Sequence, residues 1–169
     1  MNTTRALTII TAAITVALSS CTSNPKAAMK NTITQQQAIE RAEEYVRQVV
    51  SAVSPAAQPE LSGQFDDSPC DDPTDNGPTG RVIASRDYWL NDISADRQAD
   101  YVNTLVQWWS EHDFAILTDK RPNDTYVWVE NRRDGFRMAV QQTAVGPKRL
   151  SLGATSPCVW PNGTPERTP

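Results

Sequence analysis

The chain has 169 residues, of which 38% are hydrophobic and 21% are charged. This length allows one domain with a substantial core, and the composition excludes a membrane protein with several spanning helices. Sixteen lysines and arginines stand against 20 aspartates and glutamates, a formal net charge of −4. Binding along nucleic-acid phosphates requires a basic surface, so no nucleic-acid partner is expected.

The first twenty residues have the three parts of an export signal. Residues 1–5 carry one positive charge, residues 6–18 are apolar and uncharged, and the small residues Ser19 and Ser20 precede Cys21. A helix that spans a bilayer needs about 20 apolar residues, so this shorter run favours a signal peptide over 1–20 that is removed. An uncleaved anchor and a signal peptide without lipidation are the alternatives.

The residues Leu18-Ser19-Ser20-Cys21 resemble the lipobox of bacterial lipoproteins. The resemblance implies that Cys21 is joined by a thioether to a diacylglycerol, becomes the first residue of the mature chain, and can then be acylated on its amine. Two or three acyl chains on one residue give stable membrane attachment. The implied location is the outer face of the bacterial cytoplasmic membrane, with residues 21–33 as a flexible tether.

Two cysteines, Cys70 and Cys158, remain when Cys21 carries lipid. A compartment outside the cytoplasm permits disulfides, so a bridge between them is expected, and two free thiols are the alternative. The sequence contains no C-x-x-C, so neither a redox motif nor a zinc site has support.

A single domain is expected over 34–161, and it begins with a helix. Thr34 and Gln37 have the spacing of a capping box, and apolar residues then recur at every third or fourth position up to Val53. A second helix is expected to begin at Asp92 or Ser94 and to end near His112.

The segment 54–80 between these helices holds five prolines, five aspartates and three glycines. This composition predicts an irregular loop without a regular element, pinned by Cys70. Residues 162–169, at the other end of the domain, are expected to form a disordered tail.

β-branched and aromatic residues predict one strand, and period-two alternation predicts four more. One covers 81–90, before the second helix, and four follow that helix at 114–118, 125–131, 136–142 and 149–154. Short connections, among them the hairpin signal Asp134-Gly135, require the last four strands to be antiparallel. We therefore expect an α+β fold: a two-layer sandwich with a mainly antiparallel sheet of about five strands and two helices packed on one face.

The layout of 34–161 is similar to that of small lipoproteins from actinobacteria. The shared order is a helix, an acidic cysteine-containing loop, a helix and a C-terminal Ser156-Pro157-Cys158. This second resemblance implies a location in the cell envelope and no particular activity.

The sequence indicates no catalytic centre, metal site or cofactor. The only histidine, His112, falls at a helix end, where the helix dipole favours a cation. Asp119, Asp124 and Glu130 could act as acid and base, but nothing in the sequence places two of them together. The aspartates of 54–80 do not fit an EF-hand, because Ile83 occupies the position of its bidentate glutamate. A solvated acidic loop is expected there, and an irregular calcium site is the alternative.

A candidate binding surface lies on the strand 125–131. If Val127 and Val129 face the helices, Tyr126 and Trp128 lie on the open face of the sheet, near Arg137 if the hairpin register brings it alongside. Exposed Tyr, Trp and Arg are typical of a binding hot spot or of a platform on which sugars stack. The alternative, which we favour from the sequence, is that the irregular loop or the C-terminal tail covers this face.

The four other tryptophans are expected in the core or between helices and loops; they are Trp89, Trp108, Trp109 and Trp160.

The leading hypothesis is a lipid-anchored, non-enzymatic domain that binds an envelope protein or a cell-wall component. One alternative is a small envelope hydrolase that uses carboxylates or His112. The other is an accessory subunit of a membrane complex.

Overall fold

The structure is a computed structural model, and it describes residues 30–70 and 77–165. The export signal, Cys21 and most of the predicted tether lie outside the described residues. The same is true of 71–76, at the centre of the acidic segment, and of 166–169.

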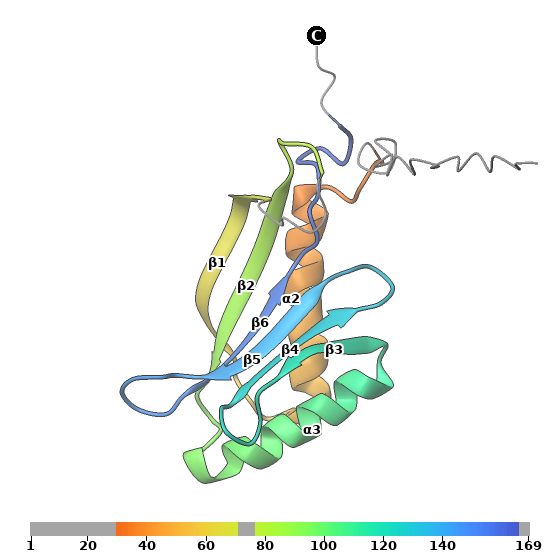
Figure 1. Ribbon diagram of the computed structural model, residues 1–169. Helices are drawn as coiled ribbons and strands as arrows, with labels where there is room; N and C mark the ends of the chain where they lie inside the picture. The colour runs from red at the N-terminus through yellow and green to blue at the C-terminus, as the bar shows by residue number, and fades with distance from the viewer. Residues whose placement is uncertain (1–29, 71–76, 166–169) are drawn as a thin grey trace, which may run out of the picture.

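Within the described residues, the fold consists of two helices and a six-stranded antiparallel sheet in the order β1-β2-β6-β5-β4-β3 (Figure 1). The strands are β1 (Glu60–Pro69), β2 (Val82–Leu90), β3 (Phe114–Asp119), β4 (Tyr126–Asn131), β5 (Arg137–Gln142) and β6 (Leu150–Thr155). The last four form the expected meander, and β2 joins it at β6. The α+β class is therefore confirmed, with one strand more than expected.

The additional strand, β1, corrects the prediction that 54–80 has no regular element. β1 is an edge strand that pairs only with β2, and its register shifts between Leu61 and Gly63 and again between Phe65 and Ser68. Glycine and proline weaken a central strand, but they are tolerated at an edge, at bulges and at strand ends. The prediction was wrong because it treated composition alone as excluding every kind of strand.

Each helix begins in a different way. α2 (Gln35–Val53) has the predicted capping box, because the Gln37 backbone N–H donates to Thr34 Oγ1 at 3.2 Å and the Thr34 N–H donates to Gln37 Oε1 at 2.9 Å. α3 (Gln98–Glu111) follows a single 3₁₀ turn, η1 (Ala95–Arg97). Ser94 precedes that turn without a side-chain cap, and Asp92 accepts a hydrogen bond from the Gln58 N–H instead.

Both helices cover the same face of the sheet. α2 packs on β2 and β6, and α3 packs on β3 and against α2. The side chains that are fully buried between the two layers include Ala38, Val46 and Val49 of α2, Val102, Leu105 and Trp109 of α3, Val127 and Val129 of β4, Val140 of β5, and Leu150 and Leu152 of β6. The opposite face of the sheet carries no helix in the described part of the chain (Figure 1).

The predicted disulfide is present between Cys70 and Cys158, whose Cα atoms are 5.6 Å apart. It joins the end of β1 to the segment that follows β6. That segment also pairs with β2, because Val82 and Val159 form an antiparallel bridge.

The C-terminal segment packs against the start of α2 and not over the open face. Trp160 Nε1 donates to the Lys30 carbonyl at 3.1 Å, and the Thr32 N–H donates to the Gly163 carbonyl at 2.9 Å. These contacts order residues 30–33, which were predicted as part of the tether, and the start of the predicted disordered tail. Both predictions are therefore wrong at these ends.

Candidate functional site

The open face of the sheet is arranged in rows of side chains that cross the strands. Residues paired in an antiparallel sheet project to the same face, so the register places each row directly. The central row runs through Trp128, Ala139, Gly153, Asp87 and Gly63. Between Trp128 and Asp87 this row consists of two small residues, Ala139 and Gly153.

Two further rows flank the central one. One row runs through Tyr126, Gln141, Ser151, Trp89 and Glu60, and the other through Glu130, Arg137, Thr155, Ser85 and Phe65. Small residues of β6, namely Ser151, Gly153 and Thr155, therefore occupy the centre of the open face, and aromatic and charged groups lie on the strands to either side.

Three predicted site residues come together on this face. Tyr126 and Trp128 are half-buried there, while Val127 and Val129 are buried against the helices. Arg137 lies beside them: its Nε donates to Glu130 Oε2 at 2.8 Å, and its guanidinium carbon lies 5.3 Å from the centre of the Trp128 ring. The sequence favoured a face covered by a loop or the tail, but none of the described segments lies over it.

Two residues of this face were missed by the sequence interpretation. Trp89, which was expected in the core, lies on the open face with the Arg149 guanidinium carbon 4.2 Å from its ring centre. Asp87 projects to the same face two residues before Trp89 and pairs with the central glycine, Gly153. The other three tryptophans pack as expected, with Trp109 and Trp160 buried and Trp108 against Phe114.

The Asp87 carboxylate occupies space that only a glycine leaves free. A Cβ at Gly153 would overlap Asp87 Oδ1. Ser85 Oγ donates to Asp87 Oδ2 at 3.3 Å, and burial raises the pKa of Asp87 above its usual value. The centre of the open face therefore presents a carboxyl group that is partly withdrawn from water.

His112 has the surroundings of a helix end. The ring is exposed and stacks on Trp108 with the ring centres 3.9 Å apart, and Nδ1–H donates to the Trp108 carbonyl at 2.7 Å. These contacts hold the ring against its own helix.

Two of the candidate carboxylates, those of Asp119 and Glu130, each bind an arginine and lie apart. Asp119 binds Arg121, which lowers the pKa of Asp119, and Glu130 binds Arg137. In the β3–β4 register Asp119 pairs with Val127, three residues from Glu130, which corresponds to about 10 Å along the strand. Asp124 lies in the turn between these strands.

Acidic groups do not gather into a metal site in the described residues. No set of three or more His, Cys, Asp or Glu side chains there could hold a metal ion. Of the aspartates in 54–80, Asp66 binds Arg86 at 2.6 Å.

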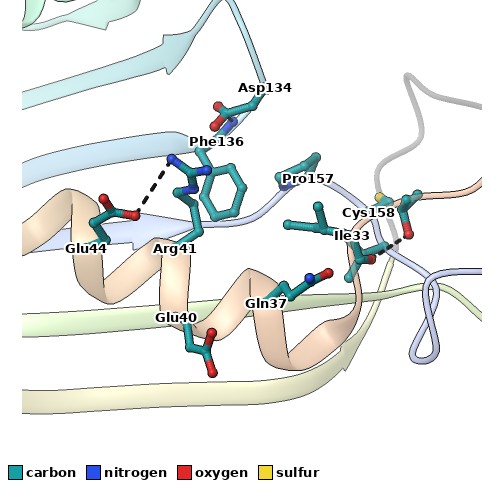
Figure 2. Close-up of a pocket in the computed structure, with 11 residues that line it drawn as sticks. Ile33, Gln37, Glu40, Arg41, Glu44, Asp134, Phe136, Pro157 and Cys158 are labelled. Atoms are coloured by element: carbon teal, nitrogen blue, oxygen red, sulfur yellow. Dashed lines mark hydrogen bonds and ion pairs between the residues drawn. The ribbon is translucent and has the colours of Figure 1, made fainter.

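A second feature, which the sequence did not suggest, is a groove of about 530 Å³ beside α2 (Figure 2). We call it the α2 groove. Its lining combines Thr32, Ile33, Gln37, Glu40, Arg41 and Glu44 with Asp134 and Phe136 of the β4–β5 hairpin and with Pro157, Cys158 and Val159. Burial, together with a 2.8 Å hydrogen bond to Asp134, raises the pKa of the neighbouring Tyr45.

Comparisons of the chain with protein-family models, with curated proteins and with solved structures find no match. Within 30–70 and 77–165, no helix is long and apolar enough to cross a membrane.

Proposed function

We propose that the protein is a lipid-anchored binding domain of the bacterial cell envelope, attached through Cys21 to the outer face of the cytoplasmic membrane. The resemblance of Leu18-Ser19-Ser20-Cys21 to a lipobox, directly after an apolar run, supports the anchor. The Cys70–Cys158 disulfide is compatible with this location, because structural disulfides persist in oxidising compartments and are rare in the cytosol.

The binding surface is an open-face patch that consists of Trp89, Tyr126, Trp128, Arg137 and Arg149. Tryptophan, tyrosine and arginine are the residues most enriched at binding hot spots. The observation that carries the proposal is that these side chains lie on the sheet face opposite the helices, with Trp89 and Arg149 on one side of β6 and Tyr126, Trp128 and Arg137 on the other, where no described segment covers them.

The partner that suits this patch is a protein that presents carboxylates beside apolar side chains. Each tryptophan has a guanidinium over its ring, Arg137 over Trp128 and Arg149 over Trp89, so the patch does not offer two bare rings on which a sugar could stack. Guanidinium groups that stack on aromatic rings are typical of protein–protein contacts, where their positive charge also favours carboxylates of the partner. We therefore favour an envelope protein over a cell-wall polysaccharide.

Site-specific photocrosslinking in the native cell tests this surface. A benzoylphenylalanine at Gln141, which is exposed between Tyr126 and Ser151, is expected to capture one defined protein. The matched position is Gln107, an exposed glutamine on α3 at the other side of the molecule. The proposal predicts a discrete adduct from position 141 and none from position 107.

A second substitution separates binding from folding. Trp128→Ala removes an aromatic ring from the open face without touching the buried layer, so it should abolish the adduct formed from position 141 while the melting temperature changes little. Equal adducts from both positions, or an adduct that survives Trp128→Ala, would contradict a binding role for the patch.

A further inference from the structure

The α2 groove has the length of a short extended peptide. Gln37, Arg41 and Glu44 lie on successive turns of α2, about 10 Å along its axis, and Ile33 continues the lining beyond the start of the helix (Figure 2). Its volume of about 530 Å³ is within the range of ligand-binding clefts. An extended segment of four or five residues, at about 3.3 Å per residue, spans this distance.

The floor and one end of the groove are apolar. Phe136 and Val159 form parts of the buried layer at its base, and Pro157 lines the side opposite α2. Ile33 is one of the few large hydrophobic side chains that the fold leaves exposed, at 39%. Apolar side chains of a ligand would therefore become buried when they bind at this end of the α2 groove.

The rim of the groove is acidic. The carboxylates of Glu44 and Asp134 lie on the same side of α2 as Phe136, beside the guanidinium of Arg41, whereas Glu40 adds a third acidic residue to the lining with its carboxylate turned away from Phe136 (Figure 2). Arg41 reaches only Glu44 among them, at 3.7 Å, and both of these side chains are more than 40% exposed. The lining thus retains two formal negative charges.

Apart from the contact between Arg41 and Glu44, the partners of these carboxylates are neutral groups that do not cancel their charge. The Gln36 amide donates to Glu40 and the Gln48 amide donates to Glu44, each at 2.9 Å, while Asp134 accepts hydrogen bonds from the Tyr45 hydroxyl and the Phe136 N–H. Preorganised carboxylates of this kind favour a cationic group and disfavour an anionic one.

We infer that the α2 groove binds an extended protein segment in which a lysine or arginine lies next to apolar residues. The basic side chain pairs with the carboxylates at the rim, and the apolar side chains cover Ile33, Phe136 and Pro157. This site is separate from the open-face patch, because its lining comes from the helix side of the molecule and from the segment after β6.

Fluorescence anisotropy with the purified full chain tests the inference. The probe is a fluorescein-labelled peptide, Leu-Lys-Leu-Lys-Leu, and two matched probes replace either the lysines by glutamate or the leucines by serine. Binding of the first peptide is expected to be at least about tenfold tighter than binding of either matched probe. If the serine peptide binds as tightly as the leucine peptide, the site responds to charge alone and the inference is wrong.

A pair of protein variants locates the binding. The first variant, Glu40→Lys with Glu44→Lys, replaces two acidic residues of the groove lining by basic ones. The second variant, Glu111→Lys with Asp124→Lys, changes the net charge of the protein by the same amount at exposed positions outside the groove. The first variant is expected to bind the leucine–lysine peptide about tenfold more weakly, and the second within about twofold of the unsubstituted chain.

Circular dichroism of both variants confirms that they fold. An equal loss of affinity in the two variants, or no loss in either, would overturn the assignment of the groove. Trp128→Ala should leave this affinity unchanged, so failure of the groove inference and failure of the open-face proposal are distinguishable.

Discussion

The Asp87 carboxylate lies over Gly153 at the centre of the open face, in the position that a Cβ of residue 153 would take. β6 is a central strand with neighbours on both sides, where glycine weakens packing and costs conformational entropy. The glycine at this position is therefore explained by the carboxylate that it accommodates.

Gly153→Ala should destabilise the native chain by about 1 kcal/mol, because Asp87 must move away from its Ser85 hydrogen bond. In a background that carries Asp87→Ala, the same substitution should stabilise by about 0.5–1 kcal/mol, since alanine is preferred to glycine within a strand. Urea denaturation of the four proteins in this cycle measures both values. An identical effect in the two backgrounds would show that the two residues are not coupled.

Replacing both disulfide cysteines by serine should lower the free energy of unfolding by about 4–5 kcal/mol. The cause is the entropy that the unfolded chain regains when a loop closed across a sequence separation of 88 is released. The urea midpoint of the double variant, compared with that of the oxidised protein, gives the loss. A midpoint that does not change would rule out this contribution.

The Tyr101 hydroxyl is buried and has no hydrogen-bond partner in the described residues. Tyr101→Phe removes this oxygen and keeps the ring, so it should stabilise the protein by about 1 kcal/mol at neutral pH. Thermal denaturation of the variant and the native chain gives the difference. A clear destabilisation would mean that the hydroxyl makes a hydrogen bond in solution.

The same tyrosine should make the fold sensitive to alkali. Burial raises the pKa of Tyr101 from 10.0 to about 12, so the folded protein holds this proton more tightly than the unfolded chain does. The stability linked to Tyr101 is then fully present below about pH 10 and is lost as the pH rises through about 12. Between pH 10 and pH 12 the melting temperature of the Tyr101→Phe variant should fall less steeply with pH than that of the native chain. Equal slopes for the two proteins would contradict a raised pKa of Tyr101.

Much of the fold could be predicted because its local signals agree with one another. The Thr34–Gln37 capping box, the Asp134-Gly135 turn and the alternating residues of β4 each predict the same structure that packing then stabilises. β1 could not be predicted in this way. Its stability comes from pairing with β2 and from contacts between distant residues, such as the bond from Arg86 to Asp66.

Only part of the open-face patch could be predicted from the sequence, because the alternation of buried and exposed residues is clear in β4 but is obscured in β2 by Arg86. Val127 and Val129 mark the buried side of β4 and so place Tyr126 and Trp128 on the other side. In β2 the charged Arg86 faces the helices, because Glu43 and Asp66 meet it there, and its side chain is only 6% exposed. A buried arginine hides the alternation of β2, so Asp87 and Trp89 could not be assigned to the open face from the sequence.

The α2 groove could not be predicted because its lining comes from three distant stretches of the chain, near residues 33–44, 134–136 and 157–159. Only the packing of the C-terminal segment beside α2 brings them together. No local pattern in any one stretch indicates a cavity.

The proposed location at the membrane is tested most directly by mass spectrometry of the N-terminal peptide from protein extracted from the native cell. We expect a mature chain in the membrane fraction that begins at Cys21 and carries the mass of a diacylglycerol on that residue. An unmodified chain that still begins at Met1, recovered in the soluble fraction, would contradict the lipid anchor and with it the proposed role in the envelope.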